Sequence, residues 1–168
     1  MPDGSMQKKP FDGFAPDAGT ERMYRDCLGR FASGVTIVTT RTATGFIGMT
    51  ANSFSSVSME PPLVLWCPAK SSSRYAAYAQ APHFAIHVLR ADQEAVARAF
   101  AKSGTAFEGL QVEENASGVP VLTDCLARFE CETYQMHDAG DHAIMVGRVR
   151  NAAFGTGEPL IFSQGRFC

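Results

Sequence analysis

The chain has 168 residues, of which 45% are hydrophobic and 19% are charged, and its formal net charge at pH 7 is −2. This composition is typical of one folded domain with its own core and excludes a fibrous or wholly disordered chain. Basic and acidic residues are interspersed, without the basic stripe expected of a protein that binds nucleic acid or an anionic membrane. No stretch approaches the ~18 consecutive apolar residues of a membrane-spanning helix, so we expect no membrane partner.

The cysteines are odd in number and include no CxxC pair, which argues against a secreted disulfide framework and against a zinc ribbon. The N-terminal residues lack the apolar segment of a signal peptide. We therefore expect a cytoplasmic protein without a metal site. The five cysteines are Cys27, Cys67, Cys125, Cys131 and Cys168.

The first predicted elements are a tail and a helix. Residues 1–19 combine proline, glycine, aspartate and lysine without periodicity, which predicts a disordered N-terminal tail, and residues 20–168 are expected to form a single domain. A helix of about three turns follows, with Thr20 as its N-cap and Ser33-Gly34 as its end. Its apolar residues at helical spacing are Met23, Tyr24, Cys27, Leu28 and Phe31.

The remaining elements are mostly strands. Residues 34–50 alternate and turn in the manner of a β-hairpin. Most neighbouring strands are joined by links too short for parallel crossovers, so we expect a mainly β, α+β fold: an antiparallel barrel with a few short helices at its ends. The other predicted strands cover 63–67, 83–89, 125–138, 142–154 and 159–163, and short helices are predicted from Tyr75 to Ala79 and over 92–101.

The sequence does not support three familiar kinds of binding site. GRFASGVT has the glycine spacing of a P-loop, but Val35 and Thr36 stand where Lys and Ser/Thr must follow, so the positive charge that would bind the phosphate is missing. There is no GxGxxG for a Rossmann turn. His83 and His87 lie in a predicted strand, where four residues span about 13 Å, too far to share a metal ion, and we expect them to be surface or edge histidines.

A first candidate site lies where a strand runs into a helix, at Cys67 to Arg74. Free backbone N–H groups, serine hydroxyls and the two cations Lys70 and Arg74 converge there, which is typical of a phosphate site. The alternative is that Ser71 or Ser72 only caps the helix.

A second candidate site is Thr50-Ala51-Asn52-Ser53-Phe54. Its small side chains would let a planar ligand approach the main chain, while amide and hydroxyl groups form hydrogen bonds. The alternative is a polar turn, and Ser55, Ser56 and Ser58 are interpreted as no more than a turn between strands. Together the two sites predict a slot for a phosphorylated flat cofactor.

Six segments in this order resemble the short-chain flavin reductase family of FMN-binding split barrels. The resemblance covers Tyr24 to Phe167. It implies a homodimer of Greek-key antiparallel barrels that binds FMN or FAD near the subunit interface. It also implies hydride transfer from NADH or NADPH to N5 of the flavin and supply of reduced flavin to a separate monooxygenase. The segments are GVTIVTT, TANSFSSVSMEPPLVLWCPAKSSS, HFAIHVL with Phe100-Ala101, LARFEC, GDHAIMVGRV and PLIFSQGRF.

The resemblance also implies roles for individual residues. His142, in the turn Gly140-Asp141-His142, would lie near the nicotinamide as an orienting group, because the cofactors carry the chemistry of hydride transfer. Its alternative is a turn histidine that only bonds Asp141. The sequence departs from the family at Phe167, where a hydroxyl-bearing aromatic is common. The implied flavin contacts are Thr50, Ala51, Asn52 and Ser53 for the ring and ribityl chain, Lys70, Ser71 and Ser73 for the phosphate, and Val35, Thr36, Cys67, Phe100 and Phe107 around the slot.

Without the resemblance, Phe100 and Phe107 are interpreted first as core residues, because phenylalanine side chains are usually buried in a folded domain. Two other functions also fit parts of the sequence. A flavin carrier or sensor without turnover would use the same slot, whereas a structural or nucleic-acid-binding barrel would need no cofactor slot. The absence of a basic stripe disfavours the nucleic-acid alternative.

Overall fold

The structure is a computed structural model that describes residues 13–168. The sequence predicted a disordered tail over residues 1–19. Residues 1–12 of this tail lie outside the described residues. In the remainder of that segment the carboxylate of Asp17 accepts hydrogen bonds from the N–H groups of Gly19 and Thr20 at 2.8 and 3.0 Å, which shapes the turn before the first helix.

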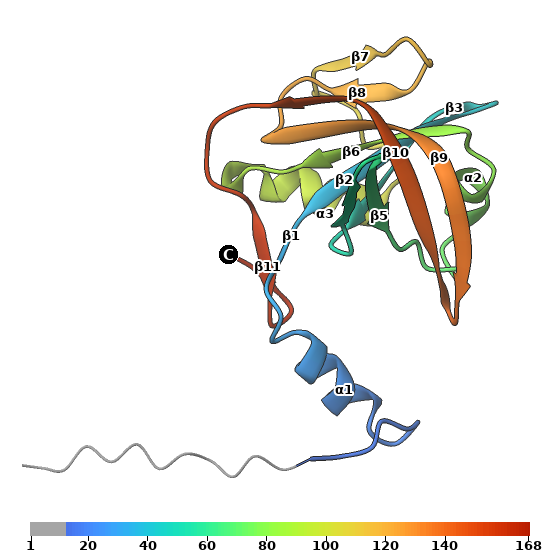
Figure 1. Ribbon diagram of the computed structural model, residues 1–168. Coiled ribbons are helices and arrows are strands. Elements are labelled where there is room, and N and C mark those ends of the chain that lie inside the picture. The colour runs from blue at the N-terminus through green and yellow to red at the C-terminus, as the bar shows by residue number, and fades with distance from the viewer. Residues whose placement is uncertain (1–12) are drawn as a thin grey trace, which may run out of the picture.

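The centre of the molecule is a seven-stranded antiparallel sheet that curves into a barrel (Figure 1), which confirms the predicted fold class. Successive side chains of a strand point to opposite faces, so one face of each strand points into the barrel, and two of the central strands are buried on their other face as well. The two longest strands form the hairpin whose turn carries Gly140 and Asp141. In sheet order the strands are β3 (Gly45–Ala51), β2 (Thr36–Thr42), β6 (His83–Val88), β9 (Ala127–Ala139), β10 (His142–Phe154), β5 (Pro62–Trp66) and β4 (Ser55–Met59).

Two smaller sheets complete the architecture. A three-stranded sheet joins β1 (Ser33–Gly34), β11 (Ile161–Ser163) and β12 (Arg166–Phe167) at the end of the barrel that leads to the first helix. A separate hairpin of β7 (Val112–Glu114) and β8 (Pro120–Leu122) covers the outer face of β6.

Two predictions about these segments were wrong. The segment with Ser55, Ser56 and Ser58 is not a turn but the edge strand β4, which pairs with β5. The segment between the helix predicted over 92–101 and the strand predicted from residue 125, where no strand was predicted, contains β7 and β8.

The apolar residues form two main clusters. One fills the barrel, where the Trp66 and Tyr78 rings meet edge to face with centroids 4.9 Å apart. The other lies outside β2 and β3, beneath α3 (Glu94–Lys102), and is centred on Phe100. The flank of β3 between these clusters is the region where the sequence predicted the ligand ring.

His87 corrects another expectation, since it is fully buried between strands. Its Nδ1 atom lies 3.0 Å from the carbonyl oxygen of Ile37, and its Nε2 atom accepts the N–H of Leu122 at 3.0 Å. Burial lowers the pKa of His87 to about 4. The neutral ring therefore joins β6, β2 and β8.

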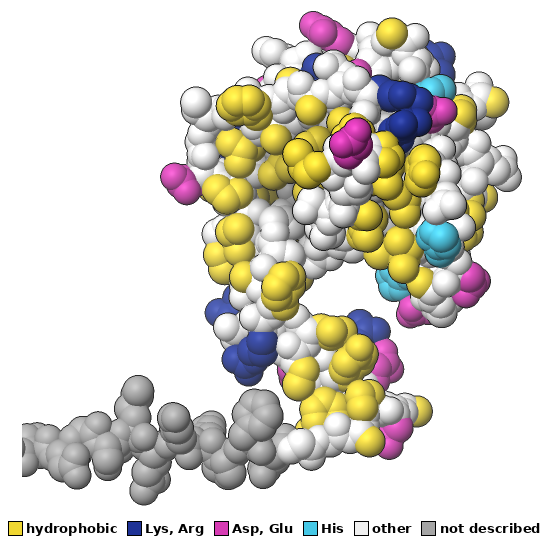
Figure 2. Space-filling model, in the orientation of Figure 1, with side chains coloured by type: hydrophobic (Ala, Val, Ile, Leu, Met, Phe, Trp, Pro, Cys, Tyr) yellow, Lys and Arg dark blue, Asp and Glu magenta, His cyan; other side chains and the backbone are white. Residues whose placement is uncertain are grey.

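The first helix, α1 (Glu21–Leu28), stands away from the barrel (Figure 1). It ends at Gly29 instead of Ser33-Gly34, and Thr20 makes no side-chain cap to it. None of its residues is buried, and Met23, Tyr24, Leu28 and the following Phe31 are exposed. Figure 2 shows hydrophobic side chains gathered on this helix. Across residues 13–168, no helix is both long and apolar enough to span a bilayer.

Two short helices flank the predicted phosphate loop and the second core. They are α2 (Tyr75–Ala79), which follows the loop, and the 3-10 turn η1 (Ala91–Gln93), which leads into α3.

Candidate functional site

The predicted ring site lies at an open edge of the barrel sheet. Strand β3 is the last strand in the sheet order. The N–H of Gly48 donates outward to the carbonyl oxygen of Gly104 at 2.8 Å, and the Gly48 carbonyl accepts Nη1 of Arg74 at 3.0 Å. Backbone groups alternate along a strand, so the N–H and C=O of Thr50 face the same open edge.

A pocket of about 270 Å³ opens beside this edge. It brings together four of the predicted contacts, and it adds Ala101 and the aromatic rings of Phe162 and Phe167, which sequence reasoning did not assign. The signal for these rings was the apolar pattern of PLIFSQGRF. The predicted residues in the lining are Val35, Thr50, Ala51 and Asn52.

The hydroxyls near the slot are occupied by the protein itself. Thr36 is buried and donates to the carbonyl oxygen of Ala51 at 2.8 Å. Thr50 donates to the carbonyl oxygen of Ala97 on α3 at 2.6 Å. Ser53 accepts the N–H of Cys67 at 2.9 Å. These side chains hold the end of β3 in place, so the main chain is the part of this edge that is left for a ligand.

The Cys67 thiol lies half-buried at the end of β5, and burial raises its pKa. It is therefore a neutral, weakly polar wall group at neutral pH and not a nucleophile.

Phe100 and Phe107 lie in the second core cluster. Phe100 is fully buried, and its ring meets that of Phe107 edge to face at 4.9 Å. A Cβ atom on Gly48 would lie 2.4 Å from Cε1 of Phe100, so the ring packs directly on the backbone of β3. Both rings thus support the strand that carries the slot from behind.

The predicted phosphate loop does not begin a helix at its serines. The helix α2 starts at Tyr75 with Arg74 as its N-cap and no side-chain cap, so neither Ser71 nor Ser72 caps it as the alternative interpretation required. Ser72 accepts the N–H of Arg74 at 3.2 Å. Ser71 and Ser73 are exposed.

Arg74 is a bracing residue whose partners the sequence did not reveal. Its guanidinium donates to the carbonyl oxygens of Gly48, Phe100 and Ala101 at 3.0, 2.6 and 3.2 Å. Because Ala101 lines the pocket, this cation ties the loop to the pocket wall.

Lys70 is bonded to the turn between β9 and β10. Its Nζ atom donates to Oδ2 of Asp138 and to the carbonyl oxygen of Gly140, both at 2.6 Å. In the same turn Nδ1 of His142 donates to Oδ1 of Asp141 at 2.8 Å, and this bond lowers the pKa of the Asp141 carboxyl. The loop with the phosphate candidates and the turn with His142 are therefore one connected unit.

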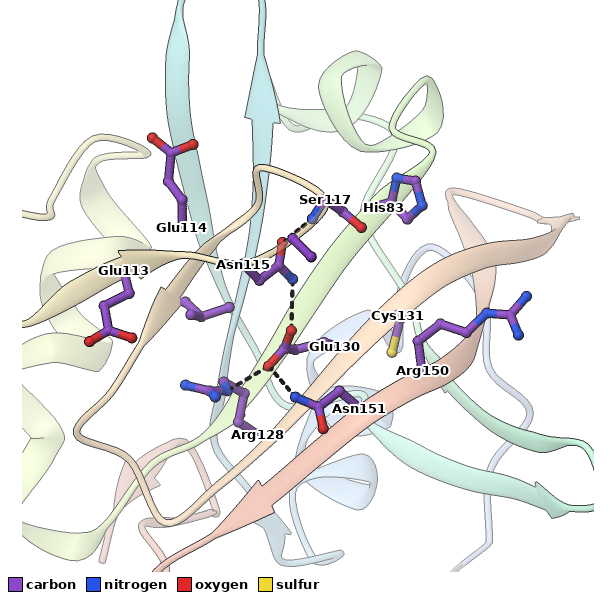
Figure 3. A pocket seen from close by; sticks show the side chains of 12 residues that line it. His83, Glu113, Glu114, Asn115, Ser117, Arg128, Glu130, Cys131, Arg150 and Asn151 are labelled. Carbon is purple, nitrogen blue, oxygen red and sulfur yellow. Dashed lines mark hydrogen bonds and ion pairs between the residues drawn. The ribbon is translucent and has the colours of Figure 1, made fainter.

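A larger pocket, of about 450 Å³, lies elsewhere, between the β7–β8 hairpin and the outer faces of β9 and β10 (Figure 3). At its centre Glu130 accepts bonds from Asn115 and Asn151 at 2.9 and 3.0 Å and pairs with Arg128 at 3.1 Å. The charges at its centre thus satisfy one another, and the network fastens the hairpin to the barrel. Within residues 13–168, no group of three or more His, Cys, Asp or Glu side chains is placed to hold a metal ion.

The ligand that the family resemblance implies for the slot beside β3 is an isoalloxazine ring. The ring has an apolar face and a polar edge with alternating hydrogen-bond donors and acceptors. The slot is lined by the side chains of Phe162 and Phe167 together with Thr50 and Asn52. The volume of the slot, about 270 Å³, is just below the roughly 300 Å³ at the lower end of cofactor pockets.

Comparison with known proteins confirms the family resemblance. The model of the flavin reductase like domain matches residues 28–168. The FMN reductase (NADH) SmoA of Agrobacterium fabrum is 55% identical over 92% of this chain and 88% of its own length. The monooxygenase reductase subunit HsaB of Rhodococcus jostii is 37% identical over 91% and 80%.

A solved structure shows the same fold. The NADH:FAD oxidoreductase SgcE6 of Streptomyces globisporus, in complex with NAD and FAD fragments, superposes with a TM-score of 0.85. It is 36% identical, and the match covers 93% of this chain and 96% of that one. The chain therefore belongs to the flavin reductase-like domain family.

Proposed function

We propose that this chain is an NAD(P)H-dependent flavin reductase that uses FMN or FAD, binds the flavin ring at the open edge of β3, and passes reduced flavin to a separate monooxygenase. The observation that carries the site assignment is the outward-facing main chain of Thr50 beside a slot lined by Phe162 and Phe167. The connected loop and turn place a cation, Lys70, and a histidine, His142, on one unit.

The residues of the chain position the reactants. When bound, the nicotinamide supplies a hydride and the flavin accepts it. The main chain of residues 50–52 holds the polar edge of the ring, and Lys70, Ser71 and Ser73 meet the phosphate. His142, held through Nδ1 by Asp141, presents Nε2 to the nicotinamide and orients it. No side chain needs to donate or remove a proton at the reacting carbon.

A homodimer is part of the proposal. A cluster of exposed apolar side chains on an amphipathic helix indicates an interaction surface, and α1 carries Met23, Tyr24 and Leu28 exposed in the single chain. The slot is also short of a full cofactor pocket, so a second copy would add the missing wall. Other large exposed apolar residues available for such an interface are Val57, Met59, Tyr134, Met136 and Phe154.

A monooxygenase partner is supported by the relatives whose names identify them as reductase components, such as HsaB. A cytoplasmic location is supported by the cysteines, since all five are unpaired thiols.

The function is tested by steady-state oxidation of NADH and NADPH with and without added FMN, FAD and riboflavin. We expect oxidation to depend on added flavin and to identify the preferred nicotinamide and flavin. A preparation that retains its flavin through dialysis and oxidises neither nicotinamide would instead identify a carrier or sensor.

A further inference from the structure

The ammonium group of Lys70 is already bonded before any ligand arrives. It donates to Asp138 on β9 and to the carbonyl of Gly140, both at 2.6 Å. The main chain reinforces this contact, because the N–H of Lys70 donates to the carbonyl oxygen of Asp141 at 2.8 Å and Ala69 forms a bridge with His142. The position of Lys70 is thus set by the turn between β9 and β10.

The carboxylate of Asp138 is the charged partner in this arrangement. Its side chain is 81% exposed, whereas that of Lys70 is 32% exposed. The hydrogen bond from Lys70, followed by its charge, lowers the pKa of Asp138, so the carboxyl is ionised at neutral pH. Any anion that approaches Lys70 therefore meets the negatively charged carboxylate of Asp138, which is paired with the same ammonium group.

We propose that Asp138 competes with the flavin phosphate for Lys70 and so holds down the affinity of the site for FMN relative to riboflavin. This inference rests on the proposed function, in which Lys70 meets the phosphate. Lysine has three N–H donors, and two are in use. A phosphate either takes the third donor and lies next to a like charge, or displaces Asp138 and loses that ion pair. Both routes lower the affinity of the site for a phosphorylated flavin.

This competition suits a protein that releases reduced flavin. Tight phosphate binding would lower the dissociation rate of the product. A lysine that is shared with Asp138 still orients the flavin phosphate, but at a lower affinity. Asp138 is therefore a specificity-determining residue for the phosphate group of the flavin, acting through Lys70.

The test compares FMN with riboflavin, which differ only in the phosphate. Dissociation constants are measured by quenching of flavin fluorescence at low salt for the wild type, Asp138→Asn, Lys70→Gln and the control Glu132→Gln. Glu132 is a matched control because it lies on the same strand and pairs with Arg150, away from the loop.

We expect Asp138→Asn to bind FMN about threefold more tightly, the effect of one exposed ion pair, with riboflavin unchanged. The gain should shrink in high salt because screening weakens it. Lys70→Gln should weaken FMN binding alone, and Glu132→Gln should change neither ligand.

FMN affinity that is unchanged or weaker in Asp138→Asn would overturn the inference, while leaving the phosphate role of Lys70 in place if Lys70→Gln still weakens FMN binding. An unchanged ratio of FMN to riboflavin affinity in Lys70→Gln would overturn both the inference and the phosphate role of Lys70. Flavin-dependent oxidation of NADH, measured on the same preparations, reports separately on the reductase function.

Discussion

Nδ1 of His142 lies 2.8 Å from Oδ1 of Asp141, the residue that precedes it in the turn between β9 and β10. A carboxylate that accepts from Nδ1 sets the tautomer and the orientation of the imidazole, so Nε2 is the nitrogen that remains for a ligand. The same turn is bonded to Lys70, which links the two predicted ends of the site.

Replacement of His142 by alanine should raise the KM for the nicotinamide about tenfold, the effect of one lost hydrogen bond, with a smaller change in flavin affinity. Steady-state kinetics with flavin titrations checks this. His137→Ala, an exposed histidine on the same hairpin, is the control. An unchanged KM in His142→Ala would show that the histidine is structural.

Thr36→Val removes the hydroxyl that donates to the Ala51 carbonyl at the slot. We expect a loss of about 1 kcal/mol in the free energy of unfolding together with weaker flavin binding. Thr40→Val is the matched control, because this buried threonine on the same strand donates to His83, away from the slot. It should lose stability but retain flavin affinity, and equal flavin affinity in the two variants would contradict the assignment.

Gly48→Ala should destabilise the fold by about 2 kcal/mol through overpacking, since the added Cβ would lie 2.4 Å from the buried Phe100 ring. Gly34→Ala serves as the comparison, because a Cβ there has no neighbour within 4 Å. Urea denaturation measures both. Equal midpoints for the two variants would mean that Phe100 does not pack on β3 in this way.

The buried His87 predicts a loss of stability in acid. Its pKa is about 4 in the folded protein against an ordinary 6.5, so the unfolded chain takes up a proton first as the pH falls. The contribution is present above pH 6.5 and is lost as the pH falls toward 4, by at most about 3 kcal/mol. Urea denaturation across this range should show a shallower pH dependence for His87→Gln than for the wild type. Parallel curves would exclude His87 as the cause.

Placing negative charges at apolar positions on α1 and just after it tests the proposed dimer. We expect the wild type to have the mass of a dimer by light scattering, and the double variant Leu28→Asp, Phe31→Asp to shift toward a monomer with weaker flavin binding. Arg22→Ala, on the same helix, should remain dimeric. A wild-type monomer with full reductase activity would contradict the dimer.

The pattern of apolar and β-branched residues predicted the central strands of the barrel well but not its polar edge. β2 and β6 are buried on both faces, and the first half of β10 is largely buried, so these segments are readily recognised as strands. β4 reads SSVSM and is mostly exposed, so it has no apolar pattern to distinguish it from a turn. β7 and β8 have three residues each, and β8 begins with proline, which leaves too little pattern to detect.

The candidate site was predictable as a location, because small residues at the end of β3 and a serine-rich loop stand close in the sequence. The partners of individual groups were not. Arg74 bonds carbonyl oxygens 26 and 27 residues away, and Lys70 bonds Asp138, 68 residues away. Such contacts depend on how the loop, α3 and the β9–β10 turn pack together, which periodicity does not encode.

The most direct test of the reductase assignment is the anaerobic bleaching of excess FMN by NADH in the presence of a small amount of the protein. Without oxygen, reduced flavin accumulates and each turnover is counted by the loss of visible flavin absorbance. We expect each protein molecule to reduce many flavins. Bleaching no faster than without protein, or bleaching that stops at one flavin per chain, would contradict it.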